Sequence, residues 1–281
     1  PFRHVPCADE VLHRGHLQHE IWMRWWVRGL EYARSPFAYH TIGSCVSVHM
    51  EAYAHARGVP SRAAGEDFHL LRKLAKLGTV IRDTGPTVDI ESRASARVPF
   101  GTGPAAARMR MEPATWRLSR PAVFEDLGRW LRVMEKIARA EPDVWSPASD
   151  ARSRIEAAIT AVMGPAWHTQ LARVSRGEGG DLRAHQWFDG LKTLRFVHAL
   201  ERHPALATCQ GAQVLGETHP VDLPVLESVC TSLWRAEQGF TKEVGRPRMC
   251  AGFREERDCT AARWMADGVI AEAKRVTLTD A

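Results

Sequence analysis

Apolar residues recur at helical spacing near the start of the chain and predict a helix from Val11 to Tyr32. Leu17, Ile21 and Trp25 stand four residues apart, and a second apolar row runs beside them. A face this wide must leave water. We expect the helix to be buried against a sheet; the alternative is that it lies on a membrane surface with its arginines at the flank.

Three histidines, His13, His16 and His19, follow one another on this helix at intervals of three residues. Metal ligation needs side chains that converge, whereas residues six apart on a helix point in different directions. We therefore expect these histidines to form a solvated edge of the helix and not a metal site.

Short extended segments are expected around a second helix. Residues 1–10 are typical of a loop, whereas small and β-branched residues from Tyr39 to Val48 predict a buried strand. Gly43, in the middle of that strand, indicates a bulge or the close approach of another backbone or a ligand. Residues 79–81 and 87–90 predict two more strands around an Asp-Thr-Gly-Pro turn.

The second helix begins with two carboxylates, Glu66 and Asp67. Gly65 lets the chain turn sharply into it, and Gly78 ends it. Apolar residues at i, i+3, i+4 and i+7 predict that one wide face is buried. The macrodipole favours negative charge in the first turn, and an ionised carboxylate is what a general base requires. Acids at this position also occur as plain partners of the helix dipole.

A loop after the third strand carries a second candidate for chemistry. Arg93 and Arg97 lead into Gly101-Thr102-Gly103, a Gly-x-Gly pattern without the helix and third glycine of a dinucleotide fingerprint. A tight loop with exposed amides beside two arginines could hold an anion. A solvated loop with structural arginines is an equal alternative.

Beyond residue 112 the pattern becomes helical. Trp187 and Phe188 are expected to be core residues. Residues 142–147 are expected to form a linker. The helices expected in this half span residues 123–140, 153–163, 167–174, 182–200, 225–240 and 261–274. Strands with an acid-tipped helix, followed by helices, predict an α/β fold with a mainly α-helical C-terminal region.

Composition limits the remaining options. The 281 residues, 44% of them hydrophobic, suffice for one large or two small domains. No window approaches ~18 uninterrupted apolar residues, so we expect no integral membrane segment. The net charge is +5, but the 38 basic residues are scattered among 33 acidic ones and form no dense run, so we expect no nucleic-acid partner. None of the six cysteines forms Cys-x-x-Cys, which favours a reducing, cytoplasmic location, with peripheral membrane contact as the alternative.

The segment Gly65-Glu66-Asp67-Phe68 resembles the Glu-Asp motif of family 2 glycosyltransferases of the GT-A fold. The resemblance continues upstream through residues 40–44 and 51–53, and downstream through residues 93–103. Members of a bacterial subgroup of the family have similar sequences over the region that corresponds to residues 17–105. A weaker resemblance follows at residues 187–195. Two positions depart from the family pattern: His69 replaces an aromatic residue, and residues 57–59 replace a Gly-Gly turn.

The resemblance implies an inverting transfer of a sugar from a nucleotide-sugar donor to an acceptor hydroxyl. Asp67 would be the catalytic base, with Glu66 beside it. The positions assigned to the substrate or the donor diphosphate are His40, Arg93, Arg97, Gly101, Thr102 and Gly103.

Two parts of such an enzyme have no counterpart in the sequence. A complete enzyme is expected to use Mg²⁺ or Mn²⁺ on an Asp-x-Asp motif, and Asp9-Glu10 lacks the strand context of that motif. The nucleotide-binding strands should come well before residue 17. We therefore expect residues 1–112 to be an incomplete, acceptor-side GT-A-like half and residues 113–281 a helical region, inactive without a donor-binding half. The alternative is a non-catalytic binding or scaffold protein that descends from a glycosyltransferase.

Overall fold

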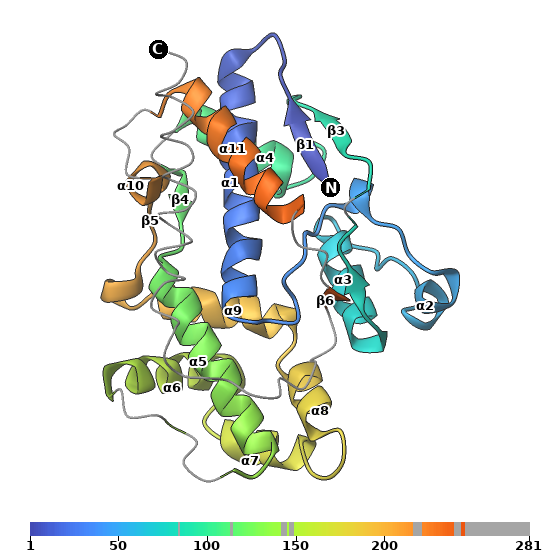
Figure 1. The fold of residues 1–281 in the computed structure, drawn as a ribbon, viewed down its shortest axis with the longest axis vertical. Helices are drawn as coiled ribbons and strands as arrows, with labels where there is room; N and C mark the ends of the chain where they lie inside the picture. The colour runs from blue at the N-terminus through green and yellow to red at the C-terminus, as the bar shows by residue number, and fades with distance from the viewer. Residues whose placement is uncertain are drawn as a thin grey trace.

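The computed structural model describes residues 1–83, 85–112, 115–141, 145, 149–215, 221–238 and 243–244. Helices make up most of this part of the chain, and the strands form three two-stranded sheets (Figure 1). Helices and strands are thus mixed, as the sequence predicts, but the sheets are small and the helical share is larger than expected.

Helix α1, Glu10–Tyr32, runs through the middle of the molecule and confirms the first predicted helix (Figure 1). Asp9 caps it by accepting a hydrogen bond from the Leu12 amide at 2.9 Å. The predicted apolar row is buried, mostly by helices and not by a sheet, because two-stranded sheets are too narrow to cover a helix of 23 residues. The helices that pack on α1 are α4 (Thr102–Met111), α5 (Pro121–Ala138) and α11 (Leu223–Gln238). Along the described residues, no helix combines the length and the apolarity needed to cross a bilayer.

The expectation that His13, His16 and His19 form a solvated edge is wrong, since all three are at least 94% buried. The helices and strand around α1 enclose its polar side as well as its apolar row. His13 Nδ1 lies 3.1 Å from Ser92 Oγ, and His16 Nε2 lies 3.2 Å from the Arg93 carbonyl oxygen. Burial, reinforced by neighbouring histidines, lowers the pKa of His16 to about 4 and that of His19 to about 3.

The first ten residues contain a strand where a loop was expected. β1, Phe2–Val5, pairs in parallel with β3, Val88–Glu91, with Phe2 opposite Val88. Phe2 and His4 are buried while Arg3 is exposed, which is the alternation typical of a strand. The sequence did not predict this strand because four residues are too few for the alternation to be recognised. The expected strands at 79–81 and 87–90 are present but pair with other segments. The remaining pairs are β2 (Val80–Ile81) with β6 (Glu243–Val244), and β4 (Arg117–Leu118) with β5 (Cys209–Gln210), both antiparallel.

The strand predicted from Tyr39 to Val48 does not form. The segment contains only the short 3₁₀ helix η1, Gly43–Cys45, between extended residues. A strand exists only when its amides and carbonyls pair with a neighbour, and no strand among the described residues pairs here. The composition of residues 39–48 correctly indicated an extended backbone, but it could not show whether another strand lies beside it.

The C-terminal helices follow the predicted order. The stretch expected as one helix over 182–200 is divided, because Phe188 leaves helical geometry and Asp189 caps a new helix. Outside the described residues lie the predicted helix at 261–274, nearly all of the linker at 142–147, and Cys250 and Cys259. The elements not yet bounded are α2 (Met50–His55), α6 (Ser149–Met163), α7 (Trp167–Val174), α8 (Gly180–Trp187), α9 (Gly190–Glu201), η3 (Pro204–Leu206) and α10 (Gly211–Leu215).

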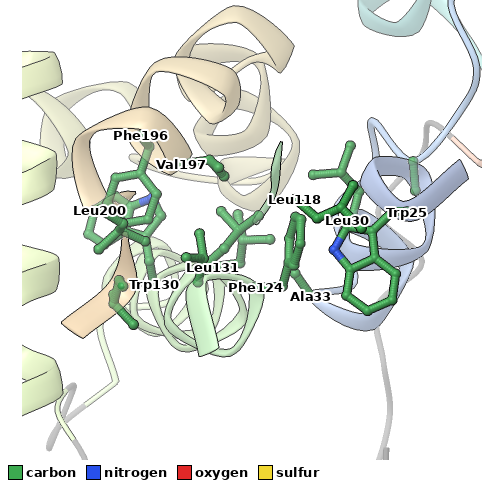
Figure 2. Packing of buried hydrophobic residues seen from close by; sticks show 14 of the residues in the cluster. Trp25, Leu30, Ala33, Leu118, Phe124, Trp130, Leu131, Phe196, Val197 and Leu200 are labelled. Carbon is green, nitrogen blue, oxygen red and sulfur yellow. The ribbon is translucent and has the colours of Figure 1, made fainter. Parts of the chain in front are cut away.

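One hydrophobic core joins the two halves of the chain. Its members run from Leu17 in α1 to Leu233 in α11 and include the buried Phe188, as predicted. Figure 2 shows Phe124 of α5 beside the α1 residues, with the α9 residues on the far side of α5. Gly29 permits this contact, because a Cβ at that position would lie 2.4 Å from the Phe124 ring. The core is thus continuous across the domain boundary predicted at residue 112.

Candidate functional site

The two predicted catalytic carboxylates lie where the sequence places them, in the first turn of α3, Glu66–Leu77. Gly65 precedes the helix with φ of +71°, a left-handed conformation that favours glycine. The side chains of Glu66 and Asp67 are both half-buried. Asp67 is therefore neither sealed in the interior nor fully free in solvent.

Two backbone amides hold the Asp67 carboxylate. The Gly43 amide donates to Oδ2 at 3.1 Å, and the Phe68 amide donates to Oδ1 at 2.7 Å. A carboxylate can accept about four hydrogen bonds, so each oxygen keeps capacity for another donor. The Asp67 side chain lies beside Gly43, but a Cβ there would meet it at 3.5 Å, an ordinary van der Waals contact, so the close approach of a backbone or ligand that the sequence suggested is not seen among the described residues. The structure thus orients the carboxylate and leaves it able to accept a proton.

A cleft of about 720 Å³ lies beside this carboxylate. The residues that line it come from the N-terminal strand, the segment around η1, α2, the end of α3 with β2, and the end of α11. Ile42 and Ser44, on either side of Gly43, both line it. Neither Glu66 nor Asp67 lines the cleft, and Gly43, whose amide holds Asp67, stands between two residues that do.

His40 lies in the cleft wall but is held by protein groups. Its Nε2 is 3.0 Å from Glu237 Oε1, and Glu237 also pairs with the buried Arg24. Burial acts to raise the pKa of Glu237, but His40 and Arg24 outweigh it and the pKa is lowered. Arg24 continues the network to Glu20, which bonds His4. His40 therefore connects the cleft to an ionic network under it, and its predicted contact with substrate stays a prediction.

The loop predicted to bind an anion is shorter than expected, because Thr102 already begins helix α4. Gly101 precedes it with φ of +114°, and Gly103 allows close packing, since a Cβ there would lie 2.7 Å from the Ser95 carbonyl oxygen. The Phe100 ring would lie 3.4 Å from a Cβ at Gly65. The structure thus brings this loop to the start of α3.

The two arginines of the loop, Arg93 and Arg97, have exposed side chains. Within the described part of the chain, no hydrogen bond or ion pair joins either side chain to Asp67. Arg93 takes part in the structure through its carbonyl oxygen, which receives the bond from His16. The structure therefore assembles the loop backbone near α3, and the arginines' role toward an anion stays a prediction.

Asp189 is an important residue that the sequence did not single out. It is 4% exposed, caps α9 by accepting from the Leu191 and Lys192 amides, and pairs with Arg72 at 3.0 Å and Lys76 at 2.6 Å. Burial alone would raise the pKa of Asp189, but these cations of α3 outweigh it and lower the pKa. The Asp-Gly step at a helix start was the available signal. This carboxylate fixes α3, and with it Asp67, against α9.

Among the described residues, no group of three or more histidine, cysteine, aspartate or glutamate side chains is arranged to hold a metal ion.

Comparison of the sequence and the structure with known proteins found no relative. No protein-family model, no curated protein and no solved structure matches the chain.

Proposed function

We propose that this chain supplies the acceptor side and the catalytic base of an inverting sugar transfer. The observation that carries the proposal is the placement of Asp67, whose half-buried carboxylate is oriented by two backbone amides, one of them from Gly43 between two residues that line a cleft of about 720 Å³. The resemblance of residues 65–68 to a glycosyltransferase motif supports the same assignment. Glu66 is its neighbour in the same helical turn.

In this reaction the acceptor hydroxyl gives its proton to a free lone pair of Asp67. The acceptor oxygen then forms a bond to the anomeric carbon of the donor sugar, from the face opposite the leaving group. The bond between that carbon and the diphosphate oxygen breaks, and the nucleoside diphosphate leaves with the electron pair. Proton removal by a positioned base contributes ~10²–10⁴-fold to such a step.

The donor-binding half, with any divalent metal for the diphosphate, is proposed to come from another polypeptide segment or partner. The segment 39–48 supports this part of the proposal, because its composition is typical of a strand, it lines part of the cleft, and no strand in the described part of the chain pairs with it. Val88 and Ile81 on the nearby strands are 42% and 71% exposed and could pack against added strands.

The test compares Asp67→Asn with Asp150→Asn. Both acids occupy the second position of a helix, but Asp150 is exposed on α6, far along the chain. The protein would be purified from its source cells under conditions that retain partners, and sugar transfer from a set of nucleotide sugars would be measured. We expect Asp67→Asn to lower turnover at least ~10²-fold and Asp150→Asn to leave it unchanged.

Equal turnover in the two variants would remove Asp67 from the role of base and leave a binding or scaffold function. Robust turnover by the isolated chain would contradict the proposed requirement for a donor-binding half.

A further inference from the structure

A second, smaller cavity of about 140 Å³ is lined in part by the segment that precedes Gly43, whose amide holds Asp67. It is lined by residues of α1, the start of α3, the start of α9 and residues 37–41, and it is partly open to solvent. Aromatic side chains dominate its walls: Trp22, Trp26, Phe37, Tyr39 and Phe68.

The size and chemistry of this cavity select a class of ligand. An apolar cavity of ~150 Å³ stays dry and binds benzene, so this one accommodates a single six-membered aromatic ring. Aromatic walls bind such a ring through offset and edge-to-face contacts. Thr193, one of the few polar residues in the walls, already donates its hydroxyl to the Asp189 carbonyl oxygen at 3.1 Å. The site therefore offers an incoming ring mainly apolar contact.

Two wall residues connect this cavity to Asp67 through the chain. Phe68, the next residue in α3, forms part of the wall, and so does Thr41. Thr41 is two residues from Gly43, whose amide holds the Asp67 carboxylate. Thr41 thus lines the smaller cavity and Ile42 and Ser44 line the larger one, Tyr39 and His40 line both, and Gly43 and Asp67 stand next to these wall residues in the chain without lining either cavity.

We propose that the smaller cavity binds the aromatic ring of a phenolic acceptor and presents its hydroxyl to Asp67. This inference rests on the proposed function and names the acceptor class for the same base. A phenolic hydroxyl has a pKa near ~10, far below that of an aliphatic alcohol, and so gives up its proton more readily to a carboxylate. The ring would lie against Trp22, Trp26 and Phe68, and the donor sugar would occupy the larger cleft.

The first arm of the test measures binding of phenol and toluene to the isolated chain by ligand-observed NMR, which needs no donor and no turnover. Leu194→Trp should fill the cavity from α9 and abolish binding of both compounds. Leu182→Trp, on α8 and 40% exposed, is the matched control and should bind both as the unmodified protein does. Trp22→Ala removes a wall residue that is 36% exposed, and should weaken ring binding about fivefold without unfolding the chain.

The second arm tests the direction of the hydroxyl. Phenol should bind about tenfold more tightly than toluene, because only phenol donates a hydrogen bond to a charged carboxylate. Asp67→Ala should remove this preference and leave toluene binding unchanged.

The outcomes separate the inference from the function on which it rests. Failure of both compounds to bind, or unchanged binding in Leu194→Trp, overturns the phenolic-acceptor site and leaves Asp67 available as a base for another acceptor. Ring binding without a preference for phenol overturns the contact between this acceptor and Asp67, whereas the role of Asp67 as base is decided separately by the turnover of Asp67→Asn against Asp150→Asn.

Discussion

The buried His19 should make the stability of this protein fall steeply on mild acidification. Its side chain is 6% exposed, stacks on Trp22 with ring centroids 5.6 Å apart, and its Nδ1 has no hydrogen-bond partner among the described residues. Burial, with further lowering by His4 and His16 and only partial opposition from Glu20, reduces its pKa from 6.5 to about 3. The perturbation we consider is the replacement His19→Leu.

The sign and size of the effect follow from proton uptake. Above pH 6.5 the residue is neutral in both states and contributes nothing to the pH dependence. As the pH falls below 6.5, unfolded His19 takes up a proton while folded His19 does not, until the pH approaches about 3. Each pH unit in that window costs the folded state about 1.4 kcal/mol, so the loss from this residue at pH 5 is about 2 kcal/mol. A typical domain is stable by only ~5–15 kcal/mol.

The assay is urea unfolding at pH 7.0, 6.0 and 5.0, followed by tryptophan fluorescence and circular dichroism. The unmodified protein should lose about 2 kcal/mol more than His19→Leu between pH 7.0 and pH 5.0. The control is His198→Leu, because His198 is a histidine with an exposed side chain, on α9. Parallel loss of stability in the protein with and without His19 would show that this imidazole is not held neutral in the folded state.

Three further predictions concern packing, an ionic link and the loop arginine. Gly15→Ala would place a methyl group 2.4 Å from a backbone oxygen of α4 and should lower the free energy of unfolding by about 1–3 kcal/mol. In the control, Gly78→Ala, the added methyl group meets nothing within 4 Å and should change this free energy little. Equal effects of the two variants in urea unfolding would contradict the tight crossing of α1 and α4. Asp189→Asn should lower the free energy of unfolding by about 1–3 kcal/mol, because it leaves two cations of α3 without their buried partner. Asp181→Asn, at a more exposed ion pair, should lower it by less than about 1 kcal/mol. Similar losses in the two variants would mean that the link between α3 and α9 is not structural. Arg97→Ala in an active preparation should raise the KM for the nucleotide sugar about tenfold with kcat nearly unchanged, and an unaltered KM would assign Arg97 to structure.

The helices were predictable where the signal is local. The start of α3 needs only Gly65, two acids and an apolar face, and all three act within a few residues of one another. The expected helix at 167–174 coincides with α7 for the same reason. The break at Asp189 was also local, but the apolar spacing on both sides of it continues in register and conceals the cap.

The strands and the buried polar groups were not predictable in this way, because they depend on distant partners. β1 exists through pairing with β3, more than eighty residues away, and residues 39–48 remain unpaired for lack of a partner among the described residues. The histidines of α1 looked solvated because helical spacing gives the direction of a side chain but not what covers it. α11, from the far end of the described chain, packs on α1, and Glu227 on α11 lies 3.6 Å from His13 Nε2.

The candidate site shows the same division between local and distant signals. The sequence identified Asp67 and the glycine at position 43 separately, and only the folded chain shows that one holds the other. That bond ties the proposed base to a segment that pairs with no strand in the described ranges, so the position of the carboxylate depends on how residues 39–48 are held. If strands of a donor-binding half pair with this segment, their arrival would move the Gly43 amide and with it Asp67. Donor binding and alignment of the base would then be one event, which would explain why the isolated chain should bind an acceptor ring yet fail to transfer a sugar.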